Sequence, residues 1–137
     1  MAVEIGIWRI DGEKAQPIPR ASLADEARLE KALLDDISLL GLGELLILGH
    51  QVETDHRKRI DILAIDSDGQ LFVIELKRDR TPRGIVAQVL DYGSWVRGLG
   101  PEEIVTVFRQ SELHEGSEFE QVFTDHFDAP LPDTLGA

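Results

Sequence analysis

Two runs rich in Ile, Val, Leu and Phe, 60–66 and 71–77, are separated by the short polar sequence DSDGQ. Asp and Gly are the usual residues of tight turns, and an apolar run on each side of them predicts a β-hairpin. With the turn centred near Asp68, residues whose numbers sum to 136 face each other. Leu63 then lies opposite Val73, and Asp61 lies opposite Glu75.

The N-terminal residues predict a second hairpin. Apolar and polar positions alternate on both sides of Asp11-Gly12, although Pro17 and Pro19 weaken the second arm. We expect residues 1–20 to form this hairpin ahead of a core at 22–127. The last ten residues, 128–137, are rich in Pro and Gly and predict a loop-like tail.

Helical signals flank the central hairpin on both sides. An S-x-x-D capping sequence at Ser22 and an apolar stripe at helical spacing predict a helix to about Asp36. Thr81 as N-cap and Pro82 as first helical residue predict a second helix, from Arg83 to about Arg97. The other expected elements are a strand at 44–54 pairing with the Asp61 strand, a fourth core strand at 102–108 and a short last helix at 117–127.

Asp61 and Glu75 face each other in this register, and the repulsion between their negative charges needs compensation. Directly opposed side chains have Cβ atoms about 4.5–5.5 Å apart, and like charges there are destabilising. A proton, a cationic side chain or a metal ion could compensate, and Asp61→Ala is expected to be at least as stable as wild type. Lys77 lies on the face of Glu75 because strand side chains alternate. A pocket of carboxylate oxygens with one ammonium suits Mg²⁺ and phosphate, so the pattern predicts phosphodiester cleavage.

Three motifs follow one another in this region: Asp61, then ELK at 75–77, then QVLDY at 88–92. Together they resemble the PD-(D/E)XK nuclease superfamily, in the branch of RecB-like nuclease domains and NucS-type mismatch endonucleases. The likeness runs over about 22–108. It implies an α/β fold with a restriction-endonuclease-like core of order α-β-β-β-α-β, in which helices flank a mixed central sheet, preceded by the N-terminal hairpin.

The resemblance implies a metal-dependent DNA endonuclease with a role in DNA repair and Mg²⁺ or Mn²⁺ as cofactor. Asp61, Glu75 and the Leu76 carbonyl would hold the ion. An acidic side chain of the first helix would be a further ligand of the ion. Glu26 and Glu30 share a face of that helix, where the helix dipole favours acids in any case, and Glu30 is the preferred candidate.

The same resemblance implies roles around the ion. Lys77 would orient or deprotonate the attacking water and stabilise the charge that develops on the phosphate. Gln88 and Tyr92 would position water or the DNA backbone, although polar residues at i and i+4 are also common on an ordinary helix surface. The phosphates of DNA would be contacted by five arginines, Arg57, Arg59, Arg78, Arg80 and Arg83.

The charge of the chain changes this picture. A net charge of −12 repels DNA, whereas DNA-binding domains usually carry a basic footprint. Residues 57–83 hold seven Lys or Arg against five acids, and the remainder holds seven against twenty-one. This basic segment is either a solvated rim or a phosphate contact, and its position beside an acidic metal site favours the second. We expect weak, strongly salt-sensitive DNA binding.

Length and composition point to one domain of 137 residues. The chain has no cysteine, which excludes disulfides and thiolate zinc sites. There is neither a signal-peptide pattern at the N-terminus nor an apolar run long enough to span a membrane, so we expect a soluble, cytoplasmic protein. The four histidines lack metal-ligand spacing: His50, His56, His114 and His126.

Two hypotheses for the function follow. The first is an active endonuclease on single-stranded, branched or mismatched DNA. The second is a catalytically incomplete nuclease-like module that binds DNA or dimerises, and that needs a missing segment or a partner chain, a homodimer included. The acids Asp61 and Glu75 together with Lys77 favour the first hypothesis, and the acidic net charge favours the second.

Overall fold

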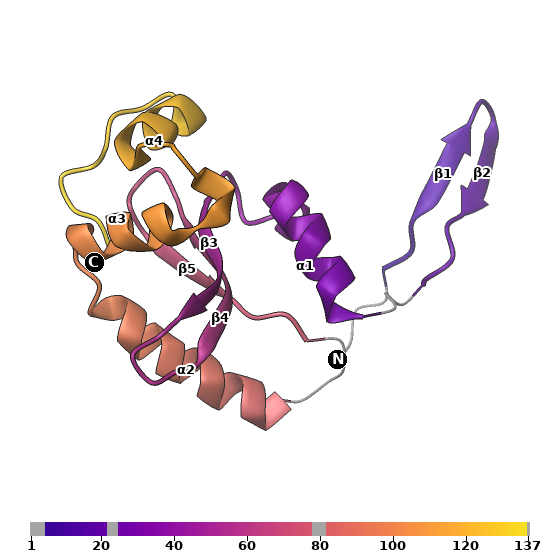
Figure 1. Ribbon diagram of the computed structural model, residues 1–137. Coiled ribbons are helices and arrows are strands. Elements are labelled where there is room, and N and C mark those ends of the chain that lie inside the picture. Colours follow the sequence, from indigo (N-terminus) through magenta and orange to yellow (C-terminus); the bar gives the residue numbers. More distant parts are fainter. Residues whose placement is uncertain (1–4, 22–24, 78–81, 137) are drawn as a thin grey trace.

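The computed structural model describes residues 5–21, 25–77 and 82–136. Within them the chain forms a two-stranded sheet, a three-stranded sheet and four α-helices, which is a mixed α/β architecture (Figure 1). The larger sheet is an antiparallel meander of three strands in spatial order β3-β4-β5. These strands are β3 (Leu46–Glu53), β4 (Arg59–Ile65) and β5 (Leu71–Ile74).

The β4–β5 hairpin has the predicted register, with Leu63 paired to Val73. Its turn is closed by Asp66, whose Oδ1 accepts the backbone N–H of Asp68 at 3.0 Å. Gly69 follows in the left-handed region at φ 84°, which glycine adopts without steric cost. The strand predicted at 44–54 is also confirmed, because β3 pairs with β4 at the edge of the sheet.

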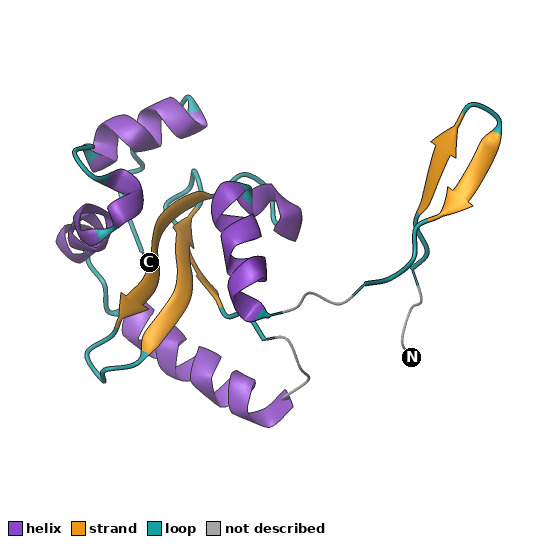
Figure 2. Ribbon diagram, turned by 45° about the vertical axis from the view of Figure 1, so that its right-hand side comes forward, coloured by secondary structure: helices purple, strands orange, loops and turns teal. Residues whose placement is uncertain are grey.

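Helices cover both faces of this sheet (Figures 1 and 2). One face carries α1 (Glu26–Asp35), followed by the 3₁₀ turn η1 (Ile37–Leu40). On the other face the core includes residues of α2 (Pro82–Arg97), α3 (Pro101–Gln110) and α4 (Phe119–Phe127). A second 3₁₀ turn, η2 (Glu112–His114), separates α3 from α4.

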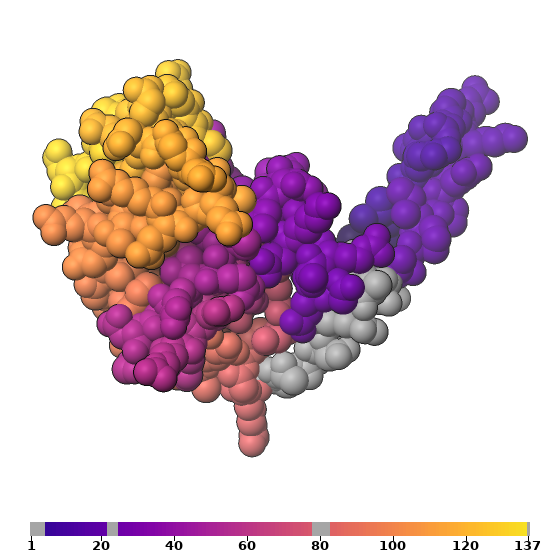
Figure 3. All heavy atoms as spheres, viewed as in Figure 1, coloured from indigo at the N-terminus to yellow at the C-terminus, as the bar shows by residue number. Residues whose placement is uncertain are grey.

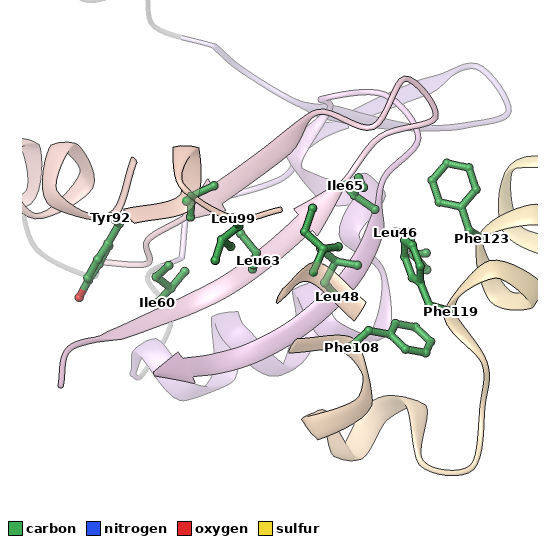
Figure 4. Packing of buried hydrophobic residues seen from close by; sticks show 12 residues of the cluster. Leu46, Leu48, Ile60, Leu63, Ile65, Tyr92, Leu99, Phe108, Phe119 and Phe123 are labelled. Atoms are coloured by element: carbon green, nitrogen blue, oxygen red, sulfur yellow. The ribbon is translucent and has the colours of Figure 1, made fainter. Parts of the chain in front are cut away.

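Each face of the sheet has its own apolar cluster. Under α1, Leu33 packs with Ile62 and Ala64 of β4. On the opposite face the larger cluster joins aromatic rings of three helices with Leu63 and Ile65 in one core, in which Tyr92 lies beside Ile60 and Phe119 beside Leu46 (Figure 4). β4 is therefore covered on both sides, and its residues from Ile62 to Ile65 are fully buried. The rings of this cluster are those of Tyr92, Phe108, Phe119 and Phe123.

The prediction of a fourth core strand at 102–108 is wrong, because this segment lies within helix α3. A proline occupies the first turn of α3 and two glutamates follow it, which favours a helix start. Ile104 and Phe108, four residues apart, are both fully buried on one face of the helix. The described sheet is therefore three-stranded and antiparallel, and not the mixed sheet expected from the family resemblance.

The edge strand β3 is covered near its start by two imidazoles from the C-terminal region. His114 lies with Nε2 2.6 Å from the carbonyl oxygen of Ile47, and His126 with Nε2 2.9 Å from that of Leu45. His114 also stacks on Phe108, with ring centroids 4.1 Å apart. Side chains, and not a further strand, thus occupy this part of the edge.

The N-terminal hairpin is confirmed as β1 (Trp8–Asp11) and β2 (Lys14–Pro17). All of its strand residues are exposed, and it stands apart from the rest of the protein (Figures 2 and 3). The tail after α4 has no helix or strand over residues 128–136, as expected. It nevertheless returns to the β4–β5 hairpin, which we call the core hairpin, because the N–H of Gly136 donates to the carbonyl of Gly69 at 2.8 Å.

The helix starts agree with the predictions in part. α2 begins at Pro82 as predicted, whereas the expected N-cap Thr81 lies outside the described residues. Ser22, the expected cap of the first helix, lies outside them too. α1 begins later than expected, with Asp25 as its N-cap accepting the N–H of Arg28 at 2.8 Å. Within the described ranges, the helices are too short or too polar to cross a membrane.

Candidate functional site

Asp61 and Glu75 lie where the pairing of β4 with β5 ends. The last backbone pair is Ile62 with Ile74, and one more step of the same register brings the two acids opposite each other. The N–H of Asp61 donates to Glu75 Oε1 at 3.2 Å, and the N–H of Leu76 donates to Asp61 Oδ2 at 2.8 Å. Each carboxylate therefore accepts a backbone N–H from the opposite segment of the hairpin.

The electrostatics of the pair are those of two half-buried acids. Burial is the main cause that raises the pKa of Glu75 above its usual value of 4.5. The hydrogen bond from the Asp61 N–H opposes this rise, the Asp61 charge adds to it, and the Lys77 charge lowers the pKa again. The protonated form of Glu75 is thus favoured relative to an exposed glutamate. A proton is one of the three compensations that the opposed acids required.

A third acid, Glu30, is linked to Asp61 by the side-chain amide of Gln51. Gln51 donates from Nε2 to Glu30 Oε2 at 2.9 Å and to Asp61 Oδ1 at 3.3 Å. The Nδ1 of His50 lies 3.2 Å from the other oxygen of Glu30. We call Glu30, Asp61 and Glu75 the carboxylate cluster. Glu30, the preferred acid of the first helix, therefore does lie beside Asp61, with one amide nitrogen between them.

His50 and Gln51 were not among the residues predicted from the sequence. The register of β3 with β4 places Gln51 opposite Asp61, since His50 pairs with Ile62 and Val52 with Ile60. Gln51 also has φ 50°, in the left-handed region that non-glycine residues seldom adopt. The strand signal at 44–54 predicts regular alternation, and nothing in it indicates this break.

Lys77 is exposed just beyond β5. Its charge lowers the pKa of the Glu75 carboxyl. Because β5 ends at Ile74, the placement of Lys77 and Glu75 on one strand face stays a prediction. Leu76 has a buried side chain, and the metal-binding role of its carbonyl stays a prediction.

Gln88 and Tyr92 form a chain of hydrogen bonds to the backbone of β4. Gln88 Nε2 donates to the Tyr92 hydroxyl at 2.8 Å, and this hydroxyl donates to the carbonyl oxygen of Arg59 at 2.8 Å. Tyr92 is only 2% exposed, so its ring belongs to the core. The pair thus fixes α2 to the start of β4, two residues before Asp61. This contact is structural, and the contact of both residues with water or the DNA backbone stays a prediction.

The basic segment is partly described. Lys58 Nζ is paired with Asp91 Oδ2 at 2.9 Å, and the pKa of Lys58 is raised by that hydrogen bond and by the charge of Asp91. Arg57, Arg59 and Arg83 are exposed and accessible to phosphate. The two other predicted contacts, Arg78 and Arg80, lie outside the described residues.

Glu75 also faces an open surface of the molecule. It lines a groove of about 450 Å³ between β5 and α2 that is otherwise apolar. Val86 and Leu90, on the α2 side of this groove, are 56% and 69% exposed. One acid of the pair is therefore reachable from outside, which a site for a large substrate requires.

The carboxylate cluster provides oxygen donors for a hard divalent cation. Among residues 5–21, 25–77 and 82–136, no three His, Cys, Asp or Glu side chains are arranged to hold a metal ion. The protein instead brings together two carboxylates, Asp61 and Glu75, with Glu30 one hydrogen-bonded amide away. Mg²⁺ binds proteins through one or two carboxylates and takes its other ligands from water and phosphate. The donor set fits such an ion.

Comparison of the chain with protein-family models, with curated proteins and with solved structures finds no match in any of the three. The likeness of the motifs to the PD-(D/E)XK superfamily therefore stays a prediction. What can be said of function rests on the geometry of the carboxylate cluster.

Proposed function

We propose that the chain is a Mg²⁺- or Mn²⁺-dependent DNA endonuclease that hydrolyses phosphodiester bonds. The observation that carries the proposal is the half-buried pair Asp61 and Glu75 at the open end of the core hairpin. Opposing two acids there costs stability, because like charges repel and burial disfavours the ionised form of Glu75. A cation site gives a physical reason for the arrangement, since it needs oxygen donors held close together.

The residues of the cluster have separate tasks in this proposal. Asp61 is oriented by the N–H of Leu76, which donates to Oδ2. Its Oδ1, which accepts the Gln51 amide at 3.3 Å, would be the oxygen that binds the ion. Glu75 supplies the second carboxylate from the position directly after β5. When bound, Mg²⁺ or Mn²⁺ would polarise the scissile phosphate and make water a better nucleophile at neutral pH.

Lys77 is proposed to act on the phosphate. It is exposed beside Glu75, so its ammonium can approach a phosphate oxygen and stabilise the charge that develops in the transition state. Gln88 and Tyr92 would act through the backbone of Arg59, which they hold in place, and not by touching the substrate. Arg57 would contact neighbouring phosphates, and such ionic contacts make binding sensitive to salt, while the net charge of −12 makes it weak.

The order of the elements supports the fold part of the proposal. Helix α1, strands β3 to β5 and helix α2 follow one another as the first five elements of a restriction-endonuclease-like core do. We propose a variant of that core in which α3 replaces the last strand. The variant keeps the two strands that carry Asp61 and Glu75.

A second candidate is a nuclease-like module that binds DNA or dimerises without cleaving. Two observations favour it. The segment 102–108 is a helix where the family core has a strand, and no group of three ligating side chains is arranged for a metal in the part of the chain that the structure describes. In this case a missing segment or a partner chain would supply the remaining ligands.

Cleavage assays on the full chain separate the two candidates. Supercoiled, single-stranded and mismatched DNA are incubated with the protein in Mn²⁺ and in chelator. The variant is Asp61→Asn, and the matched control is Asp11→Asn in the exposed N-terminal hairpin. We expect Mn²⁺-dependent cleavage that is lost in Asp61→Asn and kept in Asp11→Asn. Salt-sensitive DNA binding without cleavage by wild type would favour the second candidate, and equal cleavage by Asp61→Asn would overturn the first.

A further inference from the structure

Gln51 lies between two acids of the carboxylate cluster. One side-chain nitrogen, Nε2, donates to Glu30 of α1 and to Asp61 of β4, at 2.9 and 3.3 Å. The hydrogens of a primary amide carry partial positive charge and the nitrogen accepts nothing. The positive end of the Gln51 amide therefore occupies the position where two carboxylates from different elements converge.

The backbone of β3 departs from regular geometry to bring the amide there. Successive residues of a strand point to opposite faces, yet His50 and Gln51 both hydrogen-bond to Glu30. Gln51 has a left-handed φ of 50° although its register with β4 is kept, and the register shift of β3 lies earlier, between Ile47 and Gly49. Such conformations persist at non-glycine residues only where the surroundings hold them, and they are common at functional sites.

We propose that Gln51 is a positioning residue whose amide occupies the place of the cation between Glu30 and Asp61. Its amide holds Glu30 and Asp61 together, and it leaves this place when the cation binds. This inference rests on the proposed function, because it takes the carboxylate cluster as the cation site. It adds a residue and an exchange that the family resemblance did not imply.

The exchange is chemically reasonable because the amide and the ion compete for the same oxygens. Carboxylate oxygens are the ligands that Mg²⁺ prefers, and they bind it at about 2.1 Å, which leaves no room for a donor nitrogen between them. The Gln51 side chain is exposed and also borders an opening of about 200 Å³ beside Gln110 and Ser111. The side chain therefore has space to move out.

A purely structural role for Gln51 predicts the opposite result. If the amide only holds the acids in a productive arrangement, its removal lets Glu30 and Asp61 separate and weakens cation binding. If it stands in for the cation, its removal abolishes a competitor and strengthens binding. The sign of the change in affinity therefore distinguishes the two roles.

Isothermal titration of Mn²⁺ into the full chain measures this sign. The variants are Gln51→Ala and Gln51→Met, of which the second keeps the length of the side chain without a donor. The control is Gln110→Ala, which borders the same opening. We expect Mn²⁺ to bind about tenfold tighter to both Gln51 variants, since a lost hydrogen bond to a charged group is of that size, and unchanged to the control.

A second measurement needs no variant of uncertain stability. The side-chain NH₂ signals of Gln51 in a ¹⁵N spectrum are assigned by their absence in Gln51→Met, or by contacts to His50 if that variant does not fold. Adding Mg²⁺ to wild type should move them towards the position of a free glutamine. Signals that stay fixed while Mg²⁺ binds would overturn the inference.

The outcomes also separate this inference from the proposed function. Wild type that binds Mn²⁺, loses it in Asp61→Asn and binds no tighter in the Gln51 variants would refute the role of Gln51 alone. Wild type that binds no Mn²⁺, or Asp61→Asn that binds it unchanged, would refute the cation site and with it both proposals.

Discussion

The two hairpins of this protein share a sequence pattern and differ in almost everything else. Both pair antiparallel strands across a short polar turn. In the N-terminal hairpin Trp8 and Ile10 are 58% and 72% exposed, whereas Leu63 and Ile65 of β4 are fully buried. Alternation decides which residues share a face of a hairpin. Burial is decided by what covers that face: apolar clusters under helices cover both faces of the β4–β5 hairpin, whereas every strand residue of the N-terminal hairpin is exposed.

The difference extends to the acids of the two hairpins. Asp11 pairs in water with Arg9, whose Nε lies 2.8 Å from Asp11 Oδ2, and such exposed pairs change stability little. Asp61 and Glu75 are half-buried and face each other at the open end of the core hairpin. An acid on the exposed hairpin therefore needs no functional explanation, and the acid pair of the core hairpin does.

The largest expected effect concerns the packing of the two hairpins. Leu63→Ala should lower the free energy of unfolding by about 2–5 kcal/mol, because it leaves a cavity in the larger cluster. Ile10→Ala should change it by less than about 0.5 kcal/mol, because this side chain is already in water. Urea denaturation followed by circular dichroism measures both. A large loss in Ile10→Ala would mean that the N-terminal hairpin is covered in solution.

The next effect separates the charge of Asp61 from its hydrogen bond. From the sequence alone we expected Asp61→Ala to be at least as stable as wild type. The structure changes this expectation, because alanine leaves the N–H of Leu76 without its acceptor. Asp61→Ala should be less stable than Asp61→Asn by about 1–3 kcal/mol, since asparagine keeps an acceptor oxygen. Equal stability of the two variants in urea would show that this hydrogen bond does not form.

A smaller effect is expected where α2 meets β4. Tyr92→Phe removes the hydroxyl that donates to the carbonyl of Arg59 and should lower stability by about 0.5–1.5 kcal/mol. Gln88→Ala should cost less, because the Tyr92 hydroxyl keeps Arg59 as its acceptor. Denaturation midpoints of the two variants test this order. The reverse order would mean that Gln88 holds α2 by other contacts.

The smallest effect is the pH dependence that comes from Glu75. The pKa of Glu75 is raised in the folded protein, so its protonated form favours folding. This contribution to stability is complete below about pH 4.5 and is lost as the pH rises through the folded pKa. Without metal, Glu75→Gln should be more stable than wild type at pH 7 by about 0.2–1 kcal/mol. The advantage should vanish below pH 4.5. Glu13→Gln is the matched control, because it makes the same substitution at an exposed position of the N-terminal hairpin.

Two β-branched segments show how far the sequence predicts the fold. The segment 71–77 is correctly predicted to contain a strand, since a turn precedes it and an apolar partner lies across that turn. The segment 102–108 has the same residue types and is a helix. Its proline and glutamate start and its buried pair at i and i+4 outweigh β propensity, which depends strongly on context. The resemblance to a family with a strand at this place favoured the wrong alternative.

The candidate site was predictable where it depends on register. In the predicted register, paired residues have numbers that sum to 136, which places Asp61 opposite Glu75. Helical spacing places Gln88 beside Tyr92. The contribution of Gln51 was not predictable, because it depends on a left-handed φ at a residue that is neither Gly nor Asn. Contacts between distant elements, such as that of His50 with Glu30, have no local signal in the sequence either.

The central claim is that the acids at the open end of the core hairpin bind a divalent cation. Its most direct test is the melting temperature of the full chain in Mn²⁺ and in chelator. Wild type should melt higher in Mn²⁺, by the equivalent of about 2.7 kcal/mol at a hundred times the dissociation constant, and the shift should shrink at acid pH. Glu75→Gln should lose the shift, and Asp11→Asn should keep it. A Glu75→Gln protein with the full shift would place the ion elsewhere, for instance at the turn of Asp66 and Asp68, and would contradict the site.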